Sequence, residues 1–261
     1  MLLACNIGNS EIRLGFLDGV RLLDTVSFSN AYKRTADEYA CLIRDLLSLR
    51  GVSPCDFEDA ILASVVPDVT EAVRRGIQLL CGGLRPHLVG TGIRTGLNIL
   101  TDYPSQLGSD LVASAAGALL DYKPPLILID FGTAITFSVL EKDGSFIGCS
   151  IAPGLRLSAE ALSSGASLLP HYAYAAPKKC IGTNTVESLR SGSIHGTAAM
   201  VDGMIGRIEE ELGYPASCIA SGEGAEIILP LCRRKVLRDD SLLLRGLGAI
   251  WERNRKKTKK S

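Results

Sequence analysis

The sequence has no hydrophobic run that approaches the roughly 18 residues that a helix needs to cross a bilayer. It also has no basic leader before its first apolar residues, so we expect no signal peptide. Its eight cysteines form no Cys-x-x-Cys pair and show no spacing typical of a zinc site. Scattered thiols without an export signal are typical of a reducing compartment, so we expect a cytoplasmic protein without a membrane partner.

The chain has no net charge, because 28 basic and 28 acidic residues balance. The charges are unevenly distributed, since six of the last nine residues are basic. The rest of the chain carries 22 basic and 28 acidic residues, a net charge of −6. A short basic tail, residues 253–261, could touch nucleic acid. We favour a solvated terminus instead and expect no nucleic-acid partner.

At 261 residues, of which 46% are hydrophobic, the chain is long for one compact core. It suits two domains of about 120 to 140 residues each. Helix-like and strand-like patterns alternate from the start. Thr35 and Glu38 form a capping box before an amphipathic helix, and residues 59–67 are typical of a strand that ends in a turn. This alternation predicts an α/β fold.

The central stretch, residues 126–140, is the feature around which the rest of the chain is best interpreted. Four aliphatic residues lead directly into Asp130, as in a strand buried on both faces. A carboxylate there is costly to bury, so we expect it to meet a cation, a hydrogen-bond donor or solvent. Gly132 then permits a tight turn, or the close approach of a ligand to the backbone.

The same pattern occurs once before, at the start of the chain. Asn6 and Gly8 follow an apolar entry and stand 124 residues before the corresponding Asp and Gly of the central stretch. The repeat predicts two related domains, 1–120 and 121–261, that face each other across a cleft. Two glycine-bearing hairpins can also coexist by chance, and the repeat alone leaves both interpretations open.

Two short polar segments allow both a structural and a functional interpretation. Ser109 and Asp110 stand before an alanine-rich helix, and from this feature alone we favour simple capping of the helix N-terminus. The glycine-rich turn at 221–225 could cradle phosphate through its backbone N–H groups. A single short turn of this kind is weak support for a phosphate site.

Short motifs are spread over nearly the whole chain. They are Asn6-Ile-Gly-Asn-Ser10, Asp37-Glu-Tyr39, Ser64-Val-Val-Pro67, Gly92-Ile-Arg-Thr-Gly-Leu-Asn-Ile99, Gly108-Ser-Asp110, Asp130-Phe-Gly-Thr133, Ile151-Ala-Pro-Gly154, Asn184-Thr185, Gly246-Leu247 and Glu252-Arg253. In identity, order and spacing these motifs resemble those of the type III pantothenate kinases, a family also known through the Bvg accessory factor. So many motifs in one order are far more specific than any single one.

The resemblance implies an acetate-kinase/actin-like (ribonuclease H-like) fold, with two α/β domains and a nucleotide in the cleft between them. It implies transfer of the γ-phosphoryl group of ATP to the hydroxyl of pantothenate, the first step of coenzyme A synthesis. Such a transfer needs in-line positioning, Mg²⁺ on the phosphates and a base near the attacking hydroxyl. The implied assembly is a homodimer.

The roles of single residues are implied by the positions that match the family. Asp110 is implied to be the catalytic base, and Asp130 to bind a monovalent cation, K⁺ or NH₄⁺. The implied ATP contacts are Asn6, Ile7, Gly8, Asn9, Ser10, Glu11, Ile12, Arg13 and Thr133. The implied pantothenate pocket consists of Gly108, Ser109, Asp110, Leu111 and Thr185.

The sequence departs from the family pattern at positions near the chemistry. Asn6 stands where the family has an Asp that helps to hold Mg²⁺-phosphate, although hard cations prefer a carboxylate. Leu111 stands where the family has an Arg for the carboxylate of pantothenate, and leucine cannot make such charge-assisted hydrogen bonds. Thr101 replaces a pocket Tyr, with Tyr103 close by, and Glu223 adds a carboxylate near the nucleotide.

These departures leave three hypotheses open. Each lost charged contact costs about 1.5–3 kcal/mol, so two or three together could remove most activity on pantothenate without unfolding the protein. The first hypothesis is a pantothenate kinase with a rearranged site. The second is a kinase for another small hydroxyl acceptor that lacks the carboxylate. The third is a catalytically impaired family member with a binding or regulatory role.

Overall fold

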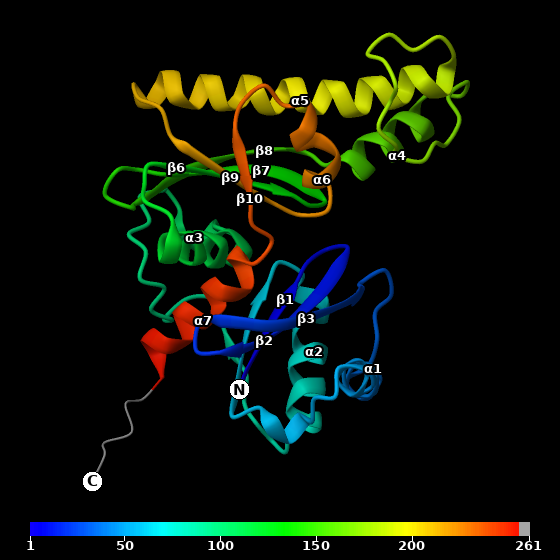
Figure 1. The fold of residues 1–261 in the computed structure, drawn as a ribbon. Coiled ribbons are helices and arrows are strands. Elements are labelled where there is room, and N and C mark those ends of the chain that lie inside the picture. Colours follow the sequence, from blue (N-terminus) through cyan, green and yellow to red (C-terminus); the bar gives the residue numbers. More distant parts are fainter. Residues whose placement is uncertain (256–261) are drawn as a thin grey trace. The chain divides into compact units, whose positions relative to one another are not determined.

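The computed structural model describes residues 1–255, and these residues form two compact units. Unit 1 comprises Met1–Tyr122 together with the chain from Ser241 onward, and unit 2 comprises Lys123–Asp240. Figure 1 follows the chain through both units. Most of the basic tail lies at 256–261, outside the described residues. None of the described helices is both long enough and apolar enough to cross a membrane.

Unit 1 is built on a five-stranded sheet with the order β3-β2-β1-β4-β5. The central strand β1 runs antiparallel to β2 and parallel to β4. Its side chains are buried except for Asn6, which is half-buried near the end of the strand, as a strand covered on both faces requires. The strands are β1 (Leu2–Ile7), β2 (Glu11–Asp18), β3 (Arg21–Ser29), β4 (Asp59–Ser64) and β5 (His87–Leu88).

Helices cover both faces of this sheet (Figure 1). One face packs against α1 and α2, and the other packs against α3 and α7. The predicted capping box of Thr35 and Glu38 is present at the start of α1, with both of its hydrogen bonds. The helices are α1 (Ala36–Leu49), α2 (Pro67–Leu80), α3 (Ser109–Asp121) and α7 (Leu242–Asn254), with short 3-10 turns η1 (Pro54–Asp56) and η2 (Pro104–Gln106).

The closing helix α7 packs in unit 1, although the sequence analysis assigned everything after residue 120 to the second half of the chain. Two glycines explain the packing. A Cβ atom at Gly117 would overlap the carbonyl oxygen of Leu242, and one at Gly246 would overlap that of Ala113. The backbones of α3 and α7 therefore approach more closely than helices with side chains at these two positions could. The expected boundary near residue 120 lies close to the observed division after Tyr122.

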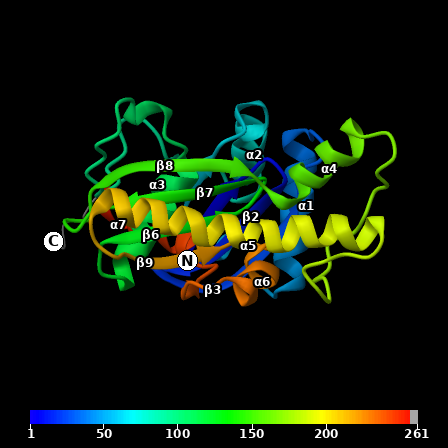
Figure 2. The same cartoon turned by 90° about the horizontal axis from the view of Figure 1, so that it is seen from above.

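Unit 2 has its own five-stranded sheet, with the order β10-β9-β6-β7-β8. The long helix α5 lies along this sheet, as Figures 1 and 2 both show. Its apolar face packs on β6, β7 and β9 in a single core cluster. The elements are β6 (Leu126–Phe131), β7 (Ala134–Leu140), β8 (Phe146–Pro153), α4 (Leu155–Gly165), α5 (Thr185–Leu212), β9 (Ser217–Ser221), α6 (Ala225–Ile228), η3 (Leu229–Leu231) and β10 (Val236–Arg238).

The two sheets have the same topology. In each unit three antiparallel strands follow one another in the chain, and the first of them also pairs in parallel with the fourth strand. The fifth strand in turn pairs in parallel with the fourth. Asn6 and Asp130 are each the last but one residue of the first strand in their unit. The predicted α/β fold with two similar domains is therefore confirmed.

Candidate functional site

The turn between β1 and β2 is narrow and tightly held. The N–H group of Gly8 donates to the carbonyl oxygen of Glu11 at 2.9 Å. A Cβ atom at Gly8 would lie only 3.1 Å from that oxygen, so glycine lets the turn close without displacing it. Asn9 is exposed and Ser10 is half-buried, so this turn lies at the surface of unit 1.

The polar side chains of β1 and β2 gather on one face of the sheet. The Oδ1 atom of Asn6 is buried and has no hydrogen-bond partner. Arg13 lies directly opposite Asn6 in the ladder, so both side chains project from the same face. The Nε atom of Arg13 lies 3.3 Å from Oε1 of Glu11. Ile7 and Ile12 are fully buried in the core, so neither of these two predicted ATP contacts is exposed to a ligand in this structure.

The predicted catalytic base lies in the first turn of α3. The N-cap residue of this helix is Gly108, and no side chain caps it, so neither of the two predicted polar residues is the N-cap. Oδ1 of Asp110 accepts a hydrogen bond from the N–H group of Leu111 at 2.8 Å. Burial raises the pKa of the Asp110 carboxyl above its ordinary value, and the Leu111 hydrogen bond opposes the shift only in part. A raised pKa makes this carboxylate a stronger base.

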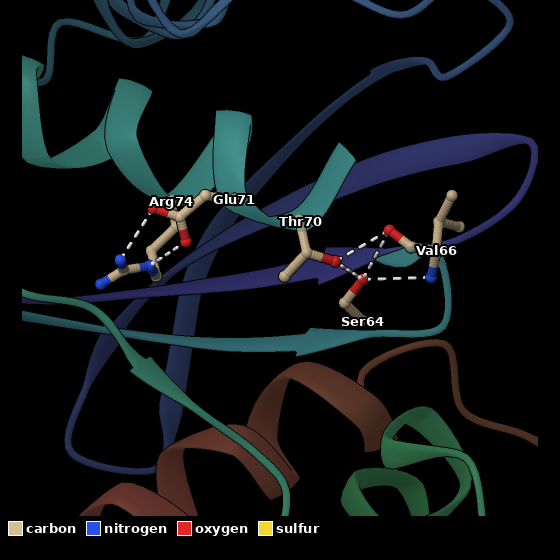
Figure 3. Close-up of polar contacts among 5 residues, drawn as sticks. All are labelled: Ser64, Val66, Thr70, Glu71 and Arg74. Carbon is tan, nitrogen blue, oxygen red and sulfur yellow. Dashed lines mark hydrogen bonds and ion pairs between the residues drawn. The ribbon is translucent and has the colours of Figure 1, made fainter. Parts of the chain in front are cut away.

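A network of hydroxyl groups holds the start of α3 against the end of β4. The Oγ atom of Ser109 accepts from the N–H of Ser64 at 2.9 Å and donates to its carbonyl oxygen at 3.0 Å. The Ser64 hydroxyl lies 2.6 Å from that of Thr70 and accepts from the N–H of Val66 at 3.1 Å (Figure 3). These bonds join the end of β4, the first turn of α2 and the first turn of α3.

The same edge of the sheet carries the end of β1. Ser64 is the parallel partner of Ile7, and the N–H of Val65 donates to the Ile7 carbonyl oxygen at 3.1 Å. A Cβ atom at Gly108 would lie 3.5 Å from the Val65 side chain. Unit 1 therefore brings the β1–β2 turn and the segment with Asp110 to one edge of one sheet.

Unit 2 places an acidic group where unit 1 has an amide. The hydroxyl of Ser221 donates to Oδ1 of Asp130 at 2.7 Å. Thr136 lies opposite Asp130 in the ladder, on the same face, and its Oγ1 atom is buried without a partner. A carboxylate beside two hydroxyl groups is an anionic, oxygen-rich set of ligands, which fits a hard cation.

Thr133 lies in a turn that other loops of unit 2 approach closely. The N–H of Gly154 donates to the Thr133 carbonyl oxygen at 3.0 Å. A Cβ at Gly154 would overlap the carbonyl oxygens of Gly132 and Thr133, and one at Gly222 would overlap the backbone of Phe131. Three backbone segments thus meet at the end of β6 because these glycines have no side chain.

The remaining predicted residues have more open surroundings. Thr185 is exposed at the first position of α5, after the N-cap Asn184. The Glu223 side chain is also exposed. In unit 1 the Thr101 hydroxyl is buried without a partner, while Tyr103 is 68% exposed.

The structure adds one residue that the sequence analysis did not single out. Nδ2 of Asn30 donates to the Gly8 carbonyl oxygen at 2.8 Å, and the backbone N–H of Asn30 donates to the Ser10 carbonyl oxygen at 2.9 Å. Asn30 thereby holds both ends of the β1–β2 turn. It is at least 20 residues from the turn in sequence, and no local pattern indicates the contact.

The arrangement suits proton abstraction beside bound phosphate groups. A carboxylate of raised pKa and a glycine-bearing turn with an arginine share one sheet edge in unit 1. Among residues 1–255, no three His, Cys, Asp or Glu side chains gather as a metal site.

Solved structures identify the class of fold. The chain aligns with a protein from Sinorhizobium meliloti described as a 2-dehydro-3-deoxygalactonokinase, with a TM-score of 0.58, 13% identity and 97% coverage of both chains. It also aligns with component A of (R)-2-hydroxyglutaryl-CoA dehydratase from Acidaminococcus fermentans, with a TM-score of 0.55, 13% identity and 96% coverage of both. Together with the repeated sheet topology, these likenesses define an actin-like fold.

Sequence relatives identify the family. The family described as "Type III pantothenate kinase" matches residues 2–207. A type III pantothenate kinase of Myxococcus xanthus is 36% identical over 97% of this chain and 99% of the relative. A type III pantothenate kinase of Geotalea uraniireducens is 38% identical over 98% of this chain and 99% of the relative. The chain belongs to the type III pantothenate kinase family, which confirms the resemblance read from its motifs, and it is therefore a kinase by family.

Proposed function

We propose that the chain transfers the γ-phosphoryl group of ATP to the hydroxyl group of pantothenate, the first step of coenzyme A synthesis. Family membership over nearly the full length supports the reaction. The observation that carries it in this chain is the position of Asp110. Its carboxylate has a raised pKa and is fixed at the sheet edge that also holds the glycine-bearing β1–β2 turn.

In this proposal Asp110 accepts the proton of the pantothenate hydroxyl as that oxygen attacks the γ-phosphorus. The Leu111 N–H group orients the carboxylate, and the raised pKa strengthens it as a base. The β1–β2 turn and Thr133 contact the nucleotide. Arg13 offers a positive charge on the face that Asn6 shares, which favours the phosphates.

Two cations belong to the proposal. Mg²⁺ would neutralise phosphate charge during transfer. In unit 1 Asn6 would offer it an amide oxygen, where a carboxylate would bind more strongly. The monovalent cation would be held by Asp130 with the hydroxyl groups of Ser221 and Thr136, which suits K⁺ or NH₄⁺.

The acceptor pocket and the assembly are also proposed from the family. Gly108, Ser109, Asp110, Leu111 and Thr185 would line the pocket for pantothenate. Leu111 makes that pocket apolar at one wall, so the carboxylate of pantothenate needs another partner or remains solvated. We expect a cytoplasmic homodimer, which light scattering on the purified chain can test.

Two other functions stay open because of specific residues. Leu111 favours a small hydroxyl acceptor without a carboxylate. Asn6 and Glu223 together favour a binding or regulatory protein, because each makes the nucleotide surroundings less suited to Mg²⁺-phosphate. Both alternatives predict little or no turnover of pantothenate, but only the first predicts ATP consumption with another acceptor.

A direct assay distinguishes the three functions. Purified protein is incubated with ATP, Mg²⁺, K⁺ and pantothenate, and phosphopantothenate is measured by mass spectrometry alongside ADP release. Phosphopantothenate formation that needs all of the components is the expected result. ADP release without phosphopantothenate in a screen of uncharged alcohols would point to another acceptor. Nucleotide binding without any turnover would point to a binding protein.

A further inference from the structure

A closed ring of hydrogen bonds fixes the turn that leads from β4 into α2 (Figure 3). The Val66 N–H donates to the Ser64 hydroxyl at 3.1 Å, and the Thr70 hydroxyl donates to the Val66 carbonyl oxygen at 2.8 Å. The two hydroxyl oxygens lie 2.6 Å apart. Because the Thr70 proton is used on Val66, the proton between the two hydroxyls comes from Ser64, and each hydroxyl both donates and accepts.

The turn held by this ring contacts two other elements at the same sheet edge. Val65 donates its N–H to the Ile7 carbonyl oxygen at the end of β1, at 3.1 Å. The Ser109 hydroxyl binds the N–H and the carbonyl oxygen of Ser64 at 2.9 and 3.0 Å. Ser64 therefore takes part in the ring through its side chain and holds the start of α3 through its backbone.

The carboxylate of Asp110 is oriented by the backbone of this first turn of α3. Its Oδ1 atom accepts from the Leu111 N–H at 2.8 Å. The same oxygen lies so close over Gly108 that a Cβ atom there would overlap it. Proton transfer needs the base within hydrogen-bond reach of the attacking hydroxyl, and a displacement of about 1 Å can cost a large part of the rate. Contacts that fix this backbone therefore also fix the proposed base.

We propose that Thr70 is a positioning residue for the phosphoryl transfer. Its hydroxyl closes the ring that holds Ser64, and the Ser64 backbone in turn holds Ser109. The first turn of α3 is thereby kept where Asp110 accepts the proton of the acceptor hydroxyl. The proposal rests on the proposed function, because it takes Asp110 as the base. Neither Thr70 nor Ser64 is among the residues proposed to contact ATP or pantothenate.

The hydroxyl of Thr70 can be removed without disturbing the core. Thr70 is half-buried, whereas the residues of α2 that pack in the core of unit 1 are Val69, Val73 and Ile77. Loss of the hydroxyl should therefore leave α2 in place and loosen the turn before it. A positioning role predicts a change in turnover that a purely structural role in α2 does not predict.

The test combines a steady-state assay with amide hydrogen exchange on the full-length protein. Thr70→Val keeps the shape of the side chain without its hydroxyl, and Thr70→Ser keeps the hydroxyl without the methyl group. Ser64→Ala opens the same ring and leaves the backbone contacts to Ser109. The matched control is Ser48→Ala. The Ser48 hydroxyl also donates to the carbonyl oxygen four residues earlier in a helix of unit 1, that of Arg44, at 2.9 Å.

We expect Thr70→Val and Ser64→Ala to lower kcat with pantothenate about tenfold, while the KM for ATP changes by less than about twofold. Thr70→Ser should keep most of the wild-type kcat, and Ser48→Ala should keep all of it. In Thr70→Val, amide exchange should become faster at 64–66 and at 109–112, because the ring and the Ser109 contact hold these segments. If kcat is unchanged, or if Thr70→Ser loses as much as Thr70→Val, the proposal is wrong.

A double variant tests whether Thr70 acts through Ser109. Once Ser109→Ala has loosened the start of α3, Thr70→Val should lower kcat little further, because both changes break the same chain of contacts. The combined loss should therefore be much smaller than the product of the two single losses. Losses that simply multiply would show that the two residues act independently and would overturn the proposal.

The outcome is separable from that of the proposed function. A wild type that binds ATP yet makes no phosphopantothenate would overturn the proposed function. Hydrogen exchange would still decide whether Thr70 holds the start of α3, and unchanged exchange at 109–112 in Thr70→Val would overturn that role. A wild type that phosphorylates pantothenate, with kcat unchanged in Thr70→Val, would overturn only the role of Thr70. If Thr70→Val fails to fold, Ser64→Ala decides by the same measurements, and an unchanged kcat there counts against the proposal.

Discussion

The hydroxyl group of Ser109 binds both backbone groups of Ser64, donating to the carbonyl oxygen at 3.0 Å and accepting from the N–H at 2.9 Å. Ser64 ends β4 and pairs with Ile7 at the end of β1. The first turn of α3, and with it Asp110, is therefore fixed to the edge of the sheet by one side chain.

Replacing this hydroxyl should affect both stability and turnover. Ser109→Ala removes a donor and an acceptor and leaves the Ser64 backbone groups without partners, so unfolding should become easier by about 1–3 kcal/mol. Turnover should fall because the orientation of Asp110 loosens. Chemical denaturation and a steady-state assay measure the two effects. Ser105→Ala, at an exposed position, is the control, and an equal loss there would refute the account.

Asp110 itself should dominate turnover. Asp110→Asn keeps the size of the side chain but removes the base, so kcat should fall about 10²–10⁴-fold. The Leu111 N–H can still donate to the remaining oxygen, so the start of α3 should stay in place. Circular dichroism and ATP affinity should therefore change little. Turnover within a few-fold of the wild type would exclude Asp110 as the base.

The same variant should be more stable than the wild type at neutral pH. Burial raises the folded pKa of Asp110 above 3.8, so the folded state holds this proton more tightly than the unfolded state. Stability is then lost as pH rises from the ordinary pKa through the folded one. Asparagine is neutral throughout, so the stability gained by Asp110→Asn should grow with pH over that window. Melting curves of both proteins from about pH 4 to about pH 8 measure it. If the stability gained by Asp110→Asn becomes smaller as the pH rises, the pKa of Asp110 is not raised in the folded state.

A carboxylate at the opposite end of β4 should matter for stability alone. Oδ2 of Asp59 accepts from the indole N–H of Trp251 at 2.7 Å and lies 3.1 Å from Nε2 of His87. Trp251 is 5% exposed, so Asp59→Ala would leave its N–H without a partner in the core. We expect a loss of about 1–3 kcal/mol in the free energy of unfolding, with kcat preserved. Fluorescence of Trp251, the only tryptophan, follows unfolding. Asp18→Ala, at an exposed position, should be neutral.

The sequence predicts the features that depend on local pattern. The apolar runs before Asn6 and Asp130 specify buried central strands, and the spacing between them anticipates the repeated sheet topology. The capping box at Thr35 specifies the start of α1, because its two hydrogen bonds lie within four residues.

Features that depend on distant contacts are outside the reach of such patterns. Gly117 and Gly246 let α7 return to unit 1, yet each looks like an ordinary helix glycine in the sequence. Ser109 is of a residue type that commonly caps helices. Its hydroxyl, however, binds Ser64, 45 residues away, and does not bind its own helix. Asn30 lies in a polar stretch without a motif, and only its contact with Gly8 shows its role.

The departures from the family pattern at Asn6 and Leu111 give the sharpest test of the proposed site. Asn6 lies on the face shared with Arg13, near the phosphates of the proposed nucleotide, whereas Leu111 is half-buried in the first turn of α3, beside the proposed acceptor pocket. Leu111→Arg should lower the KM for pantothenate, because a guanidinium can pair with its carboxylate through two hydrogen bonds. Asn6→Asp should act through kcat and the requirement for Mg²⁺, because a carboxylate binds the hard cation more strongly.

The double variant tests whether Asn6 and Leu111 act on different substrates. Changes that touch different ligands should add within about 0.5 kcal/mol, so the gain in kcat/KM of the double variant should be close to the product of the single gains. The measurement is ATP consumption with pantothenate across the wild type, both single variants and the double variant. Pantothenate amide or ester derivatives serve as the matched substrates, because Leu111→Arg should not improve their KM. If the wild type already turns over pantothenate rapidly and Leu111→Arg does not lower the KM, another basic residue holds the carboxylate. An inert double variant that still binds ATP would place the loss outside these two positions and favour the binding-protein function.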